Sequence, residues 1–132
     1  MSGAQAERDA HIGLELRRAA ELFNAAEFHA AHEVLDELWD AASPADSDFF
    51  KGLIQACIAL HHYRLGNPEG ARKLYSGHRQ YLGPYLPAHR GVDIARFLAD
   101  MQSSFGPLLR ARPGSEPPYA TLALPRLEVA AS

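Results

Sequence analysis

The sequence has 132 residues, the length of a single domain, and it is 47% hydrophobic and 22% charged, as in an ordinary globular protein. The formal net charge is −3 and the basic residues are scattered, which argues against nucleic-acid binding and against a polybasic membrane-binding patch. No stretch approaches the roughly 20 apolar residues needed to span a bilayer, and the first residues lack the apolar core of a signal peptide, so we expect a cytoplasmic protein.

Two amphipathic helices are predicted in the first third of the chain. Apolar residues recur at helical spacing over residues 7–25, with charged residues on the opposite face. A second helix is predicted over residues 27–42, and its apolar stripe contains His32 and Trp39, with Asp36 at the border of the stripe. We therefore expect Trp39 to bury most of its ring against the next helix.

The third predicted helix covers residues 48–65 and is the only segment that is apolar on nearly every face. This coverage predicts the most buried helix of the fold. Its one polar strip carries Gln55 and His62, which lie two helical turns or about 10.5 Å apart on the same side, with the small Ala59 between them. Cys57 falls among apolar residues, so we expect a buried structural thiol rather than a nucleophile.

Two more helices are predicted in the C-terminal half. One follows the capping residue Asn67 and covers residues 68–82, with proline at its first position and an acid in its first turn. After a loop at residues 87–91, the last helix covers residues 94–106, where a glycine-proline pair is expected to end it. No strand is expected anywhere in residues 7–105.

The predicted fold class is all-α. About five helices form two packed helical hairpins plus a C-terminal helix, in one domain over residues 7–110. A shift of forty residues aligns small and apolar positions of the second and fourth helices, which favours two similar hairpins. The proline-rich tail over residues 111–132 is predicted to lie extended over the bundle, with Tyr119, Leu122 and Leu124 as anchors, or to be disordered.

A set of short motifs runs through residues 21–75. It comprises an Ala-His-Glu step before a leucine and a tryptophan, a Gly-Leu-Ile-Gln segment, a histidine, and then Gly-Asn and Gly-Ala steps. The residues that carry these motifs are Ala31, His32, Glu33, Leu35, Trp39, Gly52, Leu53, Ile54, Gln55, His62, Gly66, Asn67, Gly70 and Ala71. In these motifs the chain resembles the bacterial domain-of-unknown-function family 309. The resemblance implies an all-helical fold and names no activity. Asp36 stands where that family usually has glutamate, which would move any ligand or hydrogen bond by about a methylene.

The candidate site is a polar cluster between the second and third helices. Burying an imidazole without a partner costs about 1–3 kcal/mol, so His32 needs a partner. If the two helices bury their apolar faces together, their polar edges come close. We therefore expect His32 within hydrogen-bonding or one-water distance of Asp36, Gln55 or His62, beside a small concavity near Ala59. The candidate ligand-binding or motif residues are His32, Glu33, Asp36, Trp39, Gln55 and His62.

Three functions stay open. The first is a binding or interaction module that uses this polar groove for an unknown protein or small-molecule partner. The second is a small metal-assisted hydrolase with His32 as ligand and Glu33 as base, and the third is a subunit of a structural homo-oligomer. Glu33 itself is either solvated helix surface or part of an interface. We expect no cofactor and no bound metal. A divalent metal ion would draw its ligands from His29, His32, Glu33, Asp36 and His62.

Overall fold

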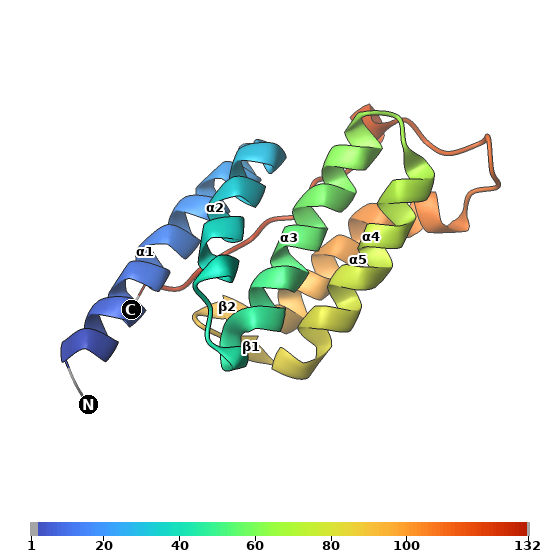
Figure 1. Ribbon diagram of the computed structural model, residues 1–132. Coiled ribbons are helices and arrows are strands. Elements are labelled where there is room, and N and C mark those ends of the chain that lie inside the picture. Colours follow the sequence, from blue (N-terminus) through green and yellow to red (C-terminus); the bar gives the residue numbers. More distant parts are fainter. Residues whose placement is uncertain (1–2, 132) are drawn as a thin grey trace.

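The computed structural model describes residues 3–131, in which five α-helices form most of the fold (Figure 1). The predicted all-α class is therefore confirmed. No helix of this described part is long and apolar enough to cross a membrane. The helices are α1 (Gly3–Asn24), α2 (Phe28–Asp40), α3 (Pro44–Arg64), α4 (Pro68–Leu82) and α5 (Ile94–Arg110); short 3-10 turns lie at Gly83–Tyr85 and Tyr119–Thr121, and two strands are β1 (Ala88–His89) and β2 (Val92–Asp93).

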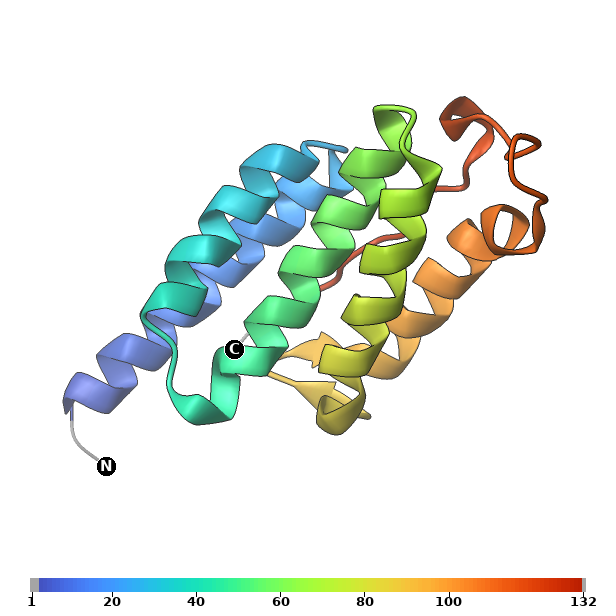
Figure 2. The same ribbon diagram turned by 45° about the vertical axis from the view of Figure 1, so that its right-hand side comes forward.

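The helices are arranged as two antiparallel hairpins, α1–α2 and α3–α4, with α5 against the second hairpin (Figures 1 and 2). α3 has the most extensive contacts, to α4 on one side and to α2 on the other. More residues are buried in α3 than in any other helix, as its apolar coverage predicts. α3 is thus the central helix, and α1 reaches the rest of the bundle mainly through α2.

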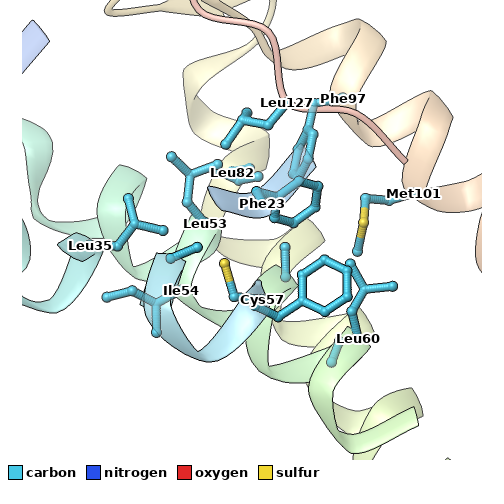
Figure 3. Close-up of a cluster of buried hydrophobic side chains, with 14 of the residues drawn as sticks. Phe23, Leu35, Leu53, Ile54, Cys57, Leu60, Leu82, Phe97, Met101 and Leu127 are labelled. Carbon is cyan, nitrogen blue, oxygen red and sulfur yellow. The ribbon is translucent and has the colours of Figure 1, made fainter. Parts of the chain in front are cut away.

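The hydrophobic core brings together side chains from all five helices and from the tail (Figure 3). Phe23 of α1, Leu53 of α3, Phe97 of α5 and Leu127 of the tail are each at most 2% exposed. Cys57 lies in the same cluster, is a free thiol, and has its pKa raised to about 12 by burial. Such a thiol is not ionised at neutral pH, so it serves packing and not nucleophilic chemistry.

Two short strands correct the expectation that residues 7–105 contain none. β1 and β2 pair antiparallel, and the turn between them places Arg90 at φ 48° and Gly91 at φ 79°. Two successive residues with positive φ form the kind of turn that matches the twist of a β-hairpin. Val92 is only 1% exposed and also bridges to Val129 of the tail, so burial stabilises this small hairpin. Two-residue strands are too short to show the alternation by which strands are recognised in a sequence.

Two helix boundaries also differ from the sequence prediction. α3 starts at Pro44, with Ser43 at the N-cap, four residues earlier than expected. Proline fits there because its missing N–H is not needed in the first helical turn. α5 continues through Pro107 to Arg110 instead of ending at the glycine-proline pair. Leu108 in the added turn is fully buried, and this burial offsets the lost backbone hydrogen bond.

The tail leaves α5 and returns across the bundle to α1 as an extended segment (Figure 2). Its main anchor is Leu127, which is 1% exposed and whose backbone exchanges two hydrogen bonds, of 2.9 and 2.8 Å, with the side chain of Asn24. Tyr119 and Leu122 are half-buried against the core. Leu124 is 44% exposed, so the expectation that it anchors the tail is wrong.

Candidate functional site

On α2, His32 pairs with the carboxylate one helical turn further along. His32 Nε2 lies 3.2 Å from Asp36 Oδ2, and the two side chains are 26% and 50% exposed. His29 forms a similar pair on the adjacent side, with its Nε2 atom 3.4 Å from Glu33 Oε1. Both pairs follow directly from the spacing of four residues in a helix. The structure therefore gives His32 a partner within its own helix.

The other two residues of the predicted cluster, Gln55 and His62, face α4 instead of α2. A Cβ atom at Gly77 of α4 would lie 1.8 Å from Gln55 Oε1, so the carboxamide rests directly on this glycine. His62 Nδ1 lies 3.2 Å from Asn67 Nδ2 at the start of α4. The residues expected to form one cluster are thus divided between two helix interfaces. Ala59, where a concavity was expected, is fully buried.

Three histidine rings lie together where α2 meets α3. The ring centroid of His29 is 6.0 Å from that of His32 and 5.8 Å from that of His61. Burial lowers the pKa of His61, and the nearby Arg64 and the other imidazoles lower it further. Nevertheless, among residues 3–131 no group of three His, Cys, Asp or Glu side chains is placed to hold a metal ion. The ligand set expected from the sequence does not converge on one point.

Trp39 lies at the edge of the bundle, not in its core. It is 36% exposed, and its ring is covered in part by Lys51 of α3, whose Nζ atom is 4.7 Å from the ring centroid. We expected Trp39 to bury most of its ring against α3. The ring does contact α3, through Lys51, but 36% of the residue stays exposed. The last turn of α2 lies beside the first turns of α3 at this point, so Trp39 meets a lysine side chain.

A buried charged cluster that the sequence did not indicate lies at the start of α3. Asp46 is 3% exposed and accepts hydrogen bonds from His89 Nε2 at 2.7 Å and from Arg90 Nε and Nη2 at 3.0 and 2.8 Å. Arg90 Nη1 also donates to Asp9 of α1 at 3.1 Å. The cluster therefore ties α1, α3 and the β1–β2 turn together. In the sequence, Asp46 is indistinguishable from an ordinary first-turn acid, and its partners are more than forty residues away.

Opposing effects set the ionisation of this cluster. Burial raises the pKa of the Asp46 carboxyl, but the hydrogen bonds and charges of Arg90 and His89 outweigh burial and hold the pKa below its ordinary value. The hydrogen bond to Asp46 in turn raises the pKa of Arg90. The rings of Phe49 and Tyr85 each lie 4.7 Å from the ring of His89. A charged, aromatic-covered cluster of this kind serves to hold elements together.

A groove is lined by residues of α1 and α2, the two helices of the first hairpin, which lie side by side in Figures 1 and 2. Its cavity has a volume of about 370 Å³, and its floor is made by apolar side chains of both helices, whereas charged side chains form its walls. The lining residues are Ala4, Glu7, Arg8, His11, Ile12, Glu15, Val34, Glu37, Leu38, Ala41 and Ala42.

A second depression continues this groove toward the turn between the two helices. It has a volume of about 300 Å³ and shares Val34 and Glu37 with the first. Glu33, a residue of the sequence motif that points away from the core, lines this second depression. Both depressions together are called the α1/α2 groove below. The sequence did not indicate this groove, although part of an interface was one of the two alternatives for Glu33.

The fold and this groove define the class of protein: a small bundle of two helical hairpins that exposes a recessed surface on the first hairpin. The family described as "Domain of unknown function (DUF309)" has a model that matches residues 16–74. This match confirms the resemblance found in the sequence. The match covers all of α2 and α3 and adjoining parts of α1 and α4.

Two bacterial proteins are similar to the chain. One, from Aquifex aeolicus (strain VF5), carries the description "Uncharacterized protein" and is 27% identical over 92 residues, which are 69% of this chain and 28% of that protein. The other, "Uncharacterized protein YpuF" from Bacillus subtilis (strain 168), is 34% identical over 91 residues, which are 60% of this chain and 51% of that protein. The chain thus spans about half or less of the length of these relatives.

Proposed function

We propose that the chain is an interaction module that binds a helical segment of another protein in the α1/α2 groove. The observation that carries this proposal is the apolar floor of the groove, which is recessed between two helices and left open by the rest of the fold. An amphipathic helix that lays its apolar face into such a groove is a recurring mode of recognition. The presence of similar segments within longer relatives fits a module that works beside other parts of a chain.

The uneven burial of residues along α1 supports this proposal. All four buried residues of α1, beginning with Leu16, lie in its C-terminal half, and none lies in residues 3–15. The first turns of α1 extend beyond the end of α2 and beyond the bundle (Figure 1). Most helices of globular proteins are stabilised by packing an apolar face. A partner helix in the groove would give the N-terminal half of α1 the packing that this fold does not supply.

The dimensions of the groove suit a helix. On α1 its lining residues run from Ala4 to Glu15, a span of eleven residue steps or about 16 Å along the axis, which is about three helical turns. Two helices side by side present a furrow into which the side-chain ridge of a third helix packs. Ile12, Val34 and Leu38 form the apolar centre of this furrow.

The direct test follows methyl NMR signals of the chain during titration with a synthetic three-turn helical peptide that has a leucine ridge and neutral glutamine flanks. We expect saturable shifts at Ile12, Val34 and Leu38 and none at Ile94, which is fully buried in α5. Ile12→Gln, within the groove, should weaken binding at least tenfold. Leu14→Gln is the matched control, because Leu14 is on the same helix, 59% exposed and outside the groove. Absent shifts, or shifts centred elsewhere, contradict the proposal.

A further inference from the structure

We infer that the occupant of the α1/α2 groove is an amphipathic helix whose apolar ridge is flanked on both sides by lysine or arginine. This inference rests on the proposed function and specifies the chemistry of the partner. The groove walls carry four glutamates, of which Glu7 and Glu15 belong to α1 and Glu33 and Glu37 to α2. Carboxylates therefore border the apolar floor from both sides, and a helix in the floor would meet them with both of its flanks.

Of these four carboxylates, two have a partner in the described part of the chain and two do not. Glu15 Oε2 lies 3.2 Å from Arg18 Nη1, and Glu33 Oε1 lies 3.4 Å from His29 Nε2. Glu7 and Glu37, on opposite walls, have no hydrogen-bond or ionic partner among residues 3–131. Cationic side chains on a partner helix would pair with these two first, one on each side. With the apolar ridge of the partner helix on the floor of the groove, its flanking cationic groups would lie level with the carboxylates of Glu7 and Glu37.

The basic residues near the groove do not neutralise these walls. Arg18 is the partner of Glu15, and Arg8 Nη2 donates to Gln5 Oε1 at 2.9 Å on its own helix. His11 is exposed and lines the first depression. Four glutamates against two arginines leave the groove with a net negative formal charge, with histidine counted as neutral. Charge complementarity therefore favours a basic occupant over an acidic one.

The same charges argue against a second copy of this chain as the occupant. In a twofold dimer the same patch meets itself, so the glutamates of one groove would approach those of the other. Like charges opposed across an interface disfavour that pairing. Small residues at the ends of the groove, Ala4, Ala41 and Ala42 at one end and Ala30 at the other, leave room for large apolar side chains of a different helix.

Exposed ion pairs contribute about 0.2–1 kcal/mol each, so two new pairs should strengthen binding by about 2- to 30-fold. The experiment compares three helical peptides that share one leucine ridge and carry lysine, glutamine or glutamate at the flanking positions. Binding is measured by fluorescence anisotropy at low salt and again at 0.5 M salt, where screening weakens exposed pairs. We expect the lysine peptide to bind most tightly and the glutamate peptide most weakly, with the difference reduced at high salt.

Variants of the chain test whether the preference for the lysine peptide arises in the groove. The double variant Glu7→Gln/Glu37→Gln should remove at least half of the preference for the lysine peptide over the glutamine peptide. The matched control is Glu21→Gln/Glu69→Gln, because both of these glutamates are exposed and outside the groove. A control that loses the preference equally would show binding to overall charge and would overturn the inference.

The remaining outcomes separate the two proposals. If all three peptides shift the groove methyl signals with equal affinity, the inference about basic flanks is wrong and the proposed function stands. If no peptide shifts these signals, both are wrong. If the chain sediments as a dimer that Ile12→Gln converts to a monomer, the occupant is a second copy, and the inference is likewise overturned.

Discussion

Two histidine–carboxylate pairs in this protein differ in almost every physical respect. His32 and Asp36 are four residues apart on α2, lie 3.2 Å apart, and are 26% and 50% exposed. His89 and Asp46 are 43 residues apart, lie 2.7 Å apart, and the Asp46 side chain is 4% exposed. The first pair joins two turns of one helix, whereas the second joins separate elements of the fold.

The difference between the two pairs shows that buried polar contacts contribute more to stability than exposed ones. Water competes for both members of an exposed pair, so a pair such as His32–Asp36 contributes little. A buried carboxylate has lost its water and depends on the groups that replace it, so removing those groups or the carboxylate has a large effect. Arg90 and His89 supply three hydrogen bonds to Asp46. The distant pair should therefore dominate the local one in every stability measurement.

The largest expected effect is that of Asp46→Ala. Removing this carboxylate leaves Arg90 partly buried, with Asp9 as its one remaining carboxylate partner among residues 3–131, and releases the β1–β2 turn from α3. We expect a loss of about 3–5 kcal/mol in the free energy of unfolding, measured by urea denaturation at pH 7. Asp36→Ala is the matched control and should lose less than about 0.5 kcal/mol. Equal losses in the two variants would contradict the comparison.

A third histidine, His78, extends the comparison because it is fully buried and has no carboxylate partner in the described part of the chain. Its Nδ1–H donates to the Tyr75 carbonyl oxygen, while Nε2 has no partner among residues 3–131. Burial lowers the pKa of His78 to about 4. Between about pH 6.5 and pH 4 the unfolded chain therefore binds a proton at this position that the folded chain does not.

The sign of the effect follows from that proton. Stability is highest above about pH 6.5 and falls as the pH decreases to about 4, by about 1.4 kcal/mol per pH unit and about 3 kcal/mol in all for His78. His61, whose pKa burial also lowers, adds to the slope in the same direction. In His78→Leu we expect the free energy of unfolding to depend less on pH between pH 6.5 and 4, because nearly one fewer proton is taken up on unfolding. Denaturant unfolding at several pH values measures this slope. An unchanged slope would show that His78 titrates normally.

Replacing Trp39, at the edge of the α2–α3 interface, should reduce stability by a smaller amount. Because its ring is 36% exposed and lies under Lys51, Trp39→Ala should lose about 1–2 kcal/mol, less than a fully buried aromatic residue. Phe28, 1% exposed on the same helix, is the matched comparison and should lose about 3–5 kcal/mol when replaced by alanine. Thermal and urea unfolding of both variants measure the difference. Similar losses would place Trp39 in the core after all.

These residues show what the sequence could predict about the fold. Helical periodicity located all five helices, because burial of an apolar face leaves a regular pattern along the chain. The Pro107 turn of α5 and the β1–β2 hairpin were missed, since both depend on burial of single residues such as Leu108 and Val92. Burial of one residue by distant parts of the chain leaves no local pattern.

The candidate site shows the same limit. The pairing of His32 with Asp36 follows from spacing on one helix. Which neighbour the polar strip of α3 faces depends on how three helices are arranged, and Gln55 and His62 turned out to face the glycines of α4. The Asp46 cluster joins residues more than forty positions apart, and the α1/α2 groove depends on how two consecutive helices pack. Apart from Glu33, their residues carried no distinguishing signal before the fold was known.

The smallest expected effect is the coupling between His32 and Asp36, and it tests the comparison most directly. In a helix, a cation that precedes its anion by four residues has the less favourable orientation relative to the helix dipole. The pair is also exposed, so water competes for both of its members. A double-mutant cycle of His32→Gln and Asp36→Asn should therefore give a coupling of less than about 0.5 kcal/mol at pH 7. The same cycle on His89→Gln and Asp46→Asn should exceed about 1 kcal/mol, because the carboxylate of that pair is buried. If the α2 pair coupled as strongly as the buried pair, exposure would not be what separates them, and His32 would be held by contacts beyond its own helix.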